Sequence, residues 1–93
     1  MGENEVIRRQ IVFYGRVQDV GFRFTATAAA RTLGLTGWVR NQYDGSVEME
    51  VQGKRLLVEK LLDDLNHQRW IRIDRMEAEQ IPLKEGESTF VTL

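Results

Sequence analysis

The feature that most constrains the fold is an abrupt change of apolar spacing across a short segment bracketed by glycines, residues 15–21. Before it, residues 6–14 are rich in β-branched and aromatic side chains, and their alternation predicts a strand. After it, residues 22–33 carry apolar side chains at the spacing of an amphipathic helix, which Gly34 is expected to end. Gly15 and Gly21 let the backbone turn sharply where a side chain would clash. The chain therefore passes from strand to helix within one tight turn.

This turn has the chemistry of an anion site. Backbone N–H groups of a tight turn and of the first turn of the following helix form a concave surface of donors that suits phosphate. Arg16 and Arg23 add positive charge, and the guanidinium of Arg23, in the first helical turn, can hold two phosphate oxygens. An ordinary strand-to-helix connection with two solvated arginines is the alternative interpretation.

The rest of the chain predicts four more strands and one more helix. The strands are expected at residues 35–41, 46–52, 70–79 and 90–93, and the helix at residues 54–65. Asp44 and Gly45 supply a hairpin turn, and Gly53 is expected to break the strand that follows it.

Two of these strands carry patterns that assign faces. Residues 46–52 alternate, so that their valines and methionine face inward while Glu48 and Glu50 face outward on a solvated surface. In residues 70–79, Ile71 and Ile73 share one face, whereas Met76 and Ala78 reach it only through a change of phase. The order βαββαβ with a terminal strand predicts a ferredoxin-like α+β sandwich, with a mostly antiparallel sheet and two helices on one face.

The crossover rule then places the candidate residues. The first strand, first helix and second strand form a right-handed unit, so both strands end at the same edge of the sheet. The turn at residues 15–21, Arg23 and Asn41 all fall at that edge, where ligands bind in open α/β folds.

Composition limits the classes of function. The 93 residues are expected to form a single domain, residues 1–93. A formal net charge of −1 gives no support to nucleic-acid or membrane binding, and the absence of cysteine removes disulfides and thiolate metal sites. Asp63 and Asp64 lack a third ligand, so no metal is expected. With neither a signal peptide nor a membrane-spanning run, we expect a cytoplasmic protein.

Asn41 adds a group that can orient water. Its carbonyl oxygen can hold a water molecule and aim it at phosphorus, and phosphoryl transfer depends more on such positioning than on a strong base. The turn at residues 15–21 contains no Cys, Ser, Thr or His, which disfavours a covalent phosphoenzyme. Acyl phosphates fit this chemistry because a carboxylate leaves without a general acid. A plain role for Asn41 as a strand-end residue is the alternative.

These motifs resemble those of the acylphosphatase family. The likeness covers nearly the whole chain and is carried by GRVQDVGFR at residues 15–23, GLTGWVRN at residues 34–41 and DGSVE at residues 44–48. It implies a ferredoxin-like fold and hydrolysis of a carboxyl phosphate to carboxylate and inorganic phosphate. Arg23 matches the family's phosphate-binding arginine, and Asn41 matches its water-orienting asparagine.

The resemblance also implies which residues form the phosphate-binding loop, which ligands the protein binds and what its oligomeric state is. The phosphate-binding loop would comprise Gly15, Arg16, Val17, Gln18, Asp19, Val20 and Gly21. The substrate would be a small acyl phosphate, with inorganic phosphate as product and competitive ligand. No metal or cofactor is implied, and the protein is expected to be a monomer.

One residue departs from the family pattern, which has glycine where this chain has Asp19. If the position needs a positive φ, aspartate is strained by about 1 kcal/mol. Its carboxylate would also repel a bound phosphate, by roughly 3 kcal/mol at ~5 Å and an effective dielectric near 20, or less if it faces water. We therefore predict reduced phosphate affinity, with Arg23 partly neutralised by Asp19 in the empty site. Alternatively, the Asp19 side chain faces outward and has little effect on phosphate affinity.

Three other functions can be considered for this topology, and the sequence argues strongly against the first of them. RNA-binding domains of this topology stack bases on aromatic residues of the third strand, but residues 46–52 contain none and present two glutamates. A phosphate-binding module that has lost turnover because of Asp19 is a second possibility. The third is a domain taken from a larger protein that handles carbamoyl phosphate.

Overall fold

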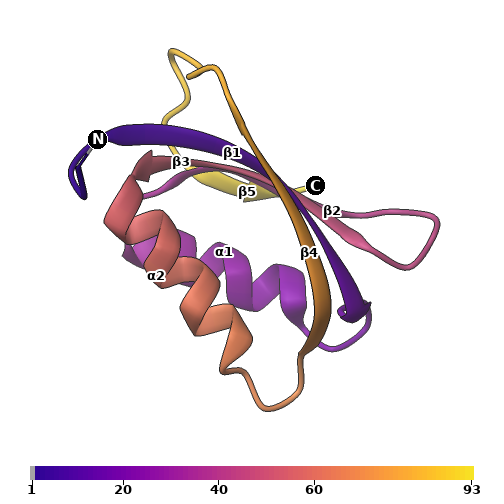
Figure 1. Cartoon of the computed structure of the whole chain (residues 1–93). Helices are drawn as coiled ribbons and strands as arrows, with labels where there is room; N and C mark the ends of the chain where they lie inside the picture. Colours follow the sequence, from indigo (N-terminus) through magenta and orange to yellow (C-terminus); the bar gives the residue numbers. More distant parts are fainter. Residues whose placement is uncertain (1) are drawn as a thin grey trace.

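Residues 2–93, which the computed structural model describes, form a five-stranded sheet with two helices on one of its faces (Figure 1). The strands are β1 (Val6–Arg16), β2 (Thr36–Asn41), β3 (Val47–Lys54), β4 (Arg72–Ile81) and β5 (Phe90–Thr92), and the helices are α1 (Phe22–Thr32) and α2 (Arg55–Asn66). The strand order is β4-β1-β3-β2-β5, and all pairs are antiparallel except β2 with β5. The predicted ferredoxin-like α+β sandwich is confirmed.

The core lies between the helices and the sheet. Alternate residues of β1 and β3 face the helices, and each helix turns one apolar stripe toward them. The central buried side chains are Ile7, Ile11, Phe13, Phe22, Ala26, Ala30, Val47, Met49, Val51, Val58, Leu61 and Leu65. The rings of Phe13 and Phe22 pack with centroids 4.9 Å apart, and this contact fixes the start of α1 against the sheet.

Helix α1 begins and ends at glycines in left-handed conformation. Gly21 has φ of 79° at its start, and Gly34 has φ of 71° just beyond its end. The N–H of Gly34 donates to the carbonyl of Arg31 at 3.1 Å, and that of Leu35 donates to Ala30 at 2.9 Å, which closes the last turn. The predicted stop at Gly34 is confirmed. Neither helix in residues 2–93 is long and apolar enough to cross a membrane.

The prediction that Gly53 breaks its strand is wrong. Gly53 pairs with Ile7 inside β3, which continues to Lys54, so α2 follows the strand directly. A Cβ at position 53 would lie 2.4 Å from Cδ2 of Leu35. Glycine is present here because the Leu35 side chain covers the backbone, rather than to end the strand.

The change of phase in β4 is confirmed and has a structural cause. Tyr14 pairs with Arg75 and Gly15 with Ile73, so Asp74 is an extra residue without a partner on β1. This β-bulge shifts the alternation by one position. Met76 and Ala78, opposite Phe13 and Ile11, thereby return to the face that carries the core.

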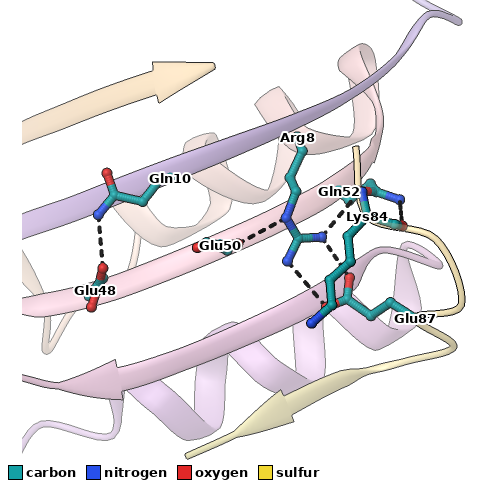
Figure 2. A network of polar contacts seen from close by, with 7 residues as sticks. All are labelled: Arg8, Gln10, Glu48, Glu50, Gln52, Lys84 and Glu87. Carbon is teal, nitrogen blue, oxygen red and sulfur yellow. Dashed lines mark hydrogen bonds and ion pairs between the residues drawn. The ribbon is translucent and has the colours of Figure 1, made fainter. Parts of the chain in front are cut away.

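The sheet face without helices is not simply solvated, contrary to the prediction for Glu48 and Glu50. Arg8 lies on this face and is only 1% exposed. Its guanidinium donates to Glu50 at 2.9 Å, to Gln52 at 3.1 Å, and to both carboxylate oxygens of Glu87 at 2.8 and 3.2 Å (Figure 2). Sequence alternation assigned the face correctly, but it could not show that the β4–β5 connection covers it.

The same network holds that connection against the sheet. The side chain of Gln52 accepts from the backbone N–H of Lys84 at 2.9 Å and donates to its carbonyl at 3.0 Å (Figure 2). Farther along the face, Glu48 accepts from Gln10 and from Arg40, each at 2.9 Å. Burial opposes ionisation of Glu48, but the hydrogen bonds prevail and lower its pKa.

Candidate active site

Strand alternation and helix position bring Arg23 and Asn41 together. In β2, Val39 is buried on the helix-facing side, so Asn41, two residues later at the strand end, lies on that side as well. Arg23 is in the first turn of α1, which begins at the same edge. These two residues line one hollow of about 160 Å³, together with Val17, Asp19, Gly21, Phe22 and Phe24.

The loop that forms this hollow requires glycine at each end. Gly15 has φ of 131°, and a Cβ there would lie 2.3 Å from the backbone oxygen of Arg72 on β4. Gly21 has open space around it but adopts a φ of 79°, which side chains rarely tolerate. The two glycines thus act through different constraints, a close approach of backbones at Gly15 and a left-handed turn at Gly21.

The start of α1 presents unused donors to the hollow. Its N-cap residue is Gly21, which offers no side-chain acceptor, and the first turn contains no acidic residue. The first helical bond runs from the N–H of Thr25 to the carbonyl of Gly21 at 2.9 Å. The N–H groups of the residues before Thr25 therefore have no acceptor within the helix, and the helix dipole adds positive potential there. This geometry favours an anion.

Arg23 is half-buried at the mouth of the hollow. Its Nη1 donates to the backbone oxygen of Leu93 at 3.1 Å, which fixes the direction of the side chain. Within residues 2–93 this is its one assigned hydrogen bond, so most of its donors remain free for a ligand.

The structure shows the backbone conformation and the exposure of Asp19. This residue is the one non-glycine residue of the described chain with a positive φ, at 61°, so the predicted strain is present. Its side chain is exposed, however, and within residues 2–93 no ion pair joins it to Arg23, which turns to Leu93 instead. Any partial neutralisation of Arg23 by Asp19 in the empty site would therefore act without a direct ion pair, and it stays a prediction.

Gln18 holds the loop against the neighbouring hairpin. Its Nε2 donates to the carbonyl oxygens of Gln42 and Ser46, at 2.7 and 2.8 Å. Ser46 also donates through its hydroxyl and its N–H to the carboxylate of Asp44, and these bonds lower the pKa of Asp44. The loop and the end of β2 are thus one connected unit, a role for Gln18 that sequence reasoning missed.

The remaining predicted loop residues lie outside the hollow. Arg16 ends β1, where it pairs with Arg72, and is exposed. Val20 packs against the core, and Arg40, next to Asn41, turns to the opposite face and pairs with Glu48. Sequence reasoning also missed Phe24, which lines the hollow. The available signal was a large aromatic residue beside Arg23 that falls off the apolar stripe of α1.

Comparison with known proteins agrees with this arrangement. The sequence model of the family described as Acylphosphatase matches residues 9–92. The chain belongs to the acylphosphatase family. The matched segment contains all of the hollow and nearly all of the sheet.

Individual acylphosphatases match over most of their length. The acylphosphatase of Bifidobacterium longum (strain NCC 2705) is 42% identical over 79 residues, which cover 84% of this chain and 81% of that protein. The crystal structure of acylphosphatase from Bacillus subtilis superposes with a TM-score of 0.86 at 26% identity, covering 94% of this chain and 98% of that one. The family, the fold and the hydrolase class expected from the sequence are confirmed.

The acylphosphatase fold also occurs inside a much longer protein. The structure of T. kodakarensis HypF superposes with a TM-score of 0.81 at 31% identity, covering 94% of this chain but only 12% of that one. This likeness concerns the shared domain alone.

Proposed function

We propose that this chain hydrolyses acyl phosphates to a carboxylate and inorganic phosphate by direct attack of water. The observation that carries the proposal is the convergence of Arg23, Asn41 and the uncapped start of α1 on one hollow. A phosphoryl group needs concentrated positive potential and an aligned nucleophile, and this arrangement can supply both.

In this proposal the phosphoryl group lies in the hollow. The backbone N–H groups of the loop and of the first turn of α1 bind its oxygens, and the free donors of Arg23 hold two of them. The bond from Arg23 to Leu93 sets the guanidinium direction before substrate arrives, so little reorganisation is needed on binding.

Asn41 would position the attacking water through its side-chain carbonyl oxygen. The water oxygen forms a bond to phosphorus while the bond from phosphorus to the acyl oxygen breaks. The electron pair of that bond leaves with the carboxylate, which needs no proton near neutral pH. The proton of the water passes to a phosphoryl oxygen. Because residues 15–21 contain no Cys, Ser, Thr or His, the water attacks without a covalent enzyme intermediate.

The remaining expectations belong to the same proposal. The chain acts as a single domain over residues 1–93, as a cytoplasmic monomer, and inorganic phosphate competes with substrate. Positive charge comes from Arg23 and the amide dipoles, so activity is expected to survive removal of divalent cations with a chelator.

A second function is kept because of Asp19. Asp19 is one of the residues that line the hollow that would hold phosphate. A phosphate-binding module with impaired or no turnover would have the same loop and the same two side chains.

Hydrolysis of acetyl phosphate by the purified chain tests the two functions. We expect turnover that Arg23→Ala and Asn41→Ala each reduce at least about 100-fold, as for loss of one preorganised group. Arg55→Ala is the matched control and should leave turnover unchanged. It removes an arginine that pairs with Glu5 where β1 begins and β3 ends, at the other end of the strands from the hollow. If this chain binds phosphate without hydrolysing acetyl phosphate, while Asp19→Gly does hydrolyse it, the chain is the phosphate-binding module with impaired turnover.

A further inference from the structure

Phe24 is a large aromatic residue with no place in the core. Its side chain is 79% exposed in the first turn of α1, whereas the buried residues of that helix are Phe22, Ala26 and Ala30. It immediately follows Arg23 and lines the same hollow as Arg23 and Asn41. The ring is therefore available for contact with a molecule bound at the hollow.

A groove leads away from the hollow and starts at Phe24. It has a volume of about 500 Å³ and is lined by Phe24, Thr27, Ala28 and Arg31 of α1 and by Val91 and Thr92 of β5. These helix residues are spaced three and four apart, so they form one strip along α1. The small side chains at positions 27 and 28 leave room between the helix and the last strand.

Part of the polar surface of the groove is already paired. The hydroxyls of Thr27 and Thr92 are hydrogen-bonded at 2.7 Å, and Nε of Arg31 donates to the carbonyl of Phe90 at 2.8 Å. Near Phe24 the groove therefore presents the aromatic ring, aliphatic carbon of Val91 and methyl groups, whereas Arg31, whose Nη groups have no assigned partner within residues 2–93, lies two helical turns away. An apolar group fits the part of the groove beside Phe24, next to the hollow, better than a charged one.

We propose that Phe24 and this groove bind the acyl group of the substrate and select acyl phosphates with aromatic or branched apolar acyl groups. The inference rests on the proposed function, because the phosphoryl group in the hollow places the acyl carbon beside the residue shared by both cavities. Phe24 acts as a specificity-determining residue: its ring packs against the acyl group, and a small acyl group such as acetyl makes little of this contact.

The test compares acetyl phosphate with benzoyl phosphate in the parent chain and in Phe24→Ala. Loss of the ring should raise KM for benzoyl phosphate about five- to tenfold more than it raises KM for acetyl phosphate. Leu56→Ala is the matched control and should leave the ratio of the two KM values unchanged. It removes an exposed apolar side chain at the start of α2, at the other end of the strands from the hollow.

Two results would overturn the inference. Equal effects on both substrates, or no effect on either, would mean that Phe24 does not contact the acyl group. A selective loss in Tyr43→Ala instead would place the acyl group in the hollow on the other side of Asn41, which Tyr43 lines.

A binding measurement separates this inference from the proposed function. If the parent chain hydrolyses neither substrate, the proposed function fails, and the groove is judged from affinities for benzylphosphonate and methylphosphonate measured by calorimetry. Preference for the benzyl compound that Phe24→Ala abolishes would support the groove, and equal affinity for both compounds would reject it.

Discussion

Arg8 and Arg23 differ in how their hydrogen-bond donors are used. Arg8 makes four hydrogen bonds to the side chains of Glu50, Gln52 and Glu87 on the sheet face without helices (Figure 2). Within the described residues 2–93, Arg23 makes one, to a backbone oxygen, and it lines a hollow. Both guanidinium groups carry the same charge, yet Arg8 uses four of its five donors within the protein, whereas most donors of Arg23 are left for a ligand.

The difference shows what burial requires of a charge. A guanidinium removed from water must have its donors satisfied by the protein, since an unpaired buried charge is very costly. Such a group can then only stabilise the fold. A half-exposed guanidinium held by a single bond keeps its direction without losing its capacity to bind, and this combination suits a phosphate site.

Arg8→Met tests the structural side of the comparison and should have the largest effect on stability. It leaves Glu50 and Glu87 without their cation, so we expect the free energy of unfolding to fall by about 3 kcal/mol. Urea denaturation measures it. Arg23→Met is the matched control and should change stability by less than about 1 kcal/mol, since it removes one hydrogen bond at the surface. Equal losses in the two variants would remove the distinction between these arginines.

Glu87→Gln gives a pH-dependent version of the same test. The hydrogen bond from Arg8 lowers the pKa of Glu87 below its ordinary value of 4.5. A lowered pKa in the folded state adds stability above pH 4.5, and this contribution is lost as the pH falls through the lowered value. We expect the variant to be less stable than the parent chain at pH 7 by about 1–2 kcal/mol, with the difference shrinking below pH 4.5. A difference that does not depend on pH would mean that the charge of Glu87 is unimportant.

Asp19→Gly tests the functional side of the comparison between the two arginines. Of these variants it should change stability the least. Glycine adopts the φ of 61° without strain, so stability should rise by less than about 1 kcal/mol. Because Asp19 is exposed, its repulsion of phosphate at ~5 Å in water is about 0.8 kcal/mol, which is roughly a fourfold change in affinity. A phosphate titration by calorimetry measures it. An unchanged affinity would show that the carboxylate does not act on the bound anion.

The sequence was sufficient wherever local pattern determined the outcome. The strand and helix order, the stop at Gly34 and the phase change in β4 all follow from apolar spacing and backbone preference. Placement of Asn41 near Arg23 at one edge followed from the crossover rule, and both line the hollow.

What the sequence could not predict depends on contacts between distant segments. Arg8 and Glu87 are far apart in the chain, and no periodicity indicates that the β4–β5 connection covers the sheet. The contacts of Gly53 with Leu35, and of Arg23 with Leu93, are likewise set by the packing of distant segments. The functional roles of Arg23 and Asn41 remain predictions until variants are measured.

The bulge at Asp74 affects how readily two copies of this protein can associate through the edges of their sheets. The strand β4 lies at one edge of the sheet, and an extra unpaired residue there distorts the ladder that another chain would extend. Charged side chains at Arg72, Arg75 and Glu77 line the same edge. The opposite edge, β5, is only three residues long. Both ends of the sheet therefore offer a poor template for amyloid-like growth, which favours survival of the folded protein in a crowded solution.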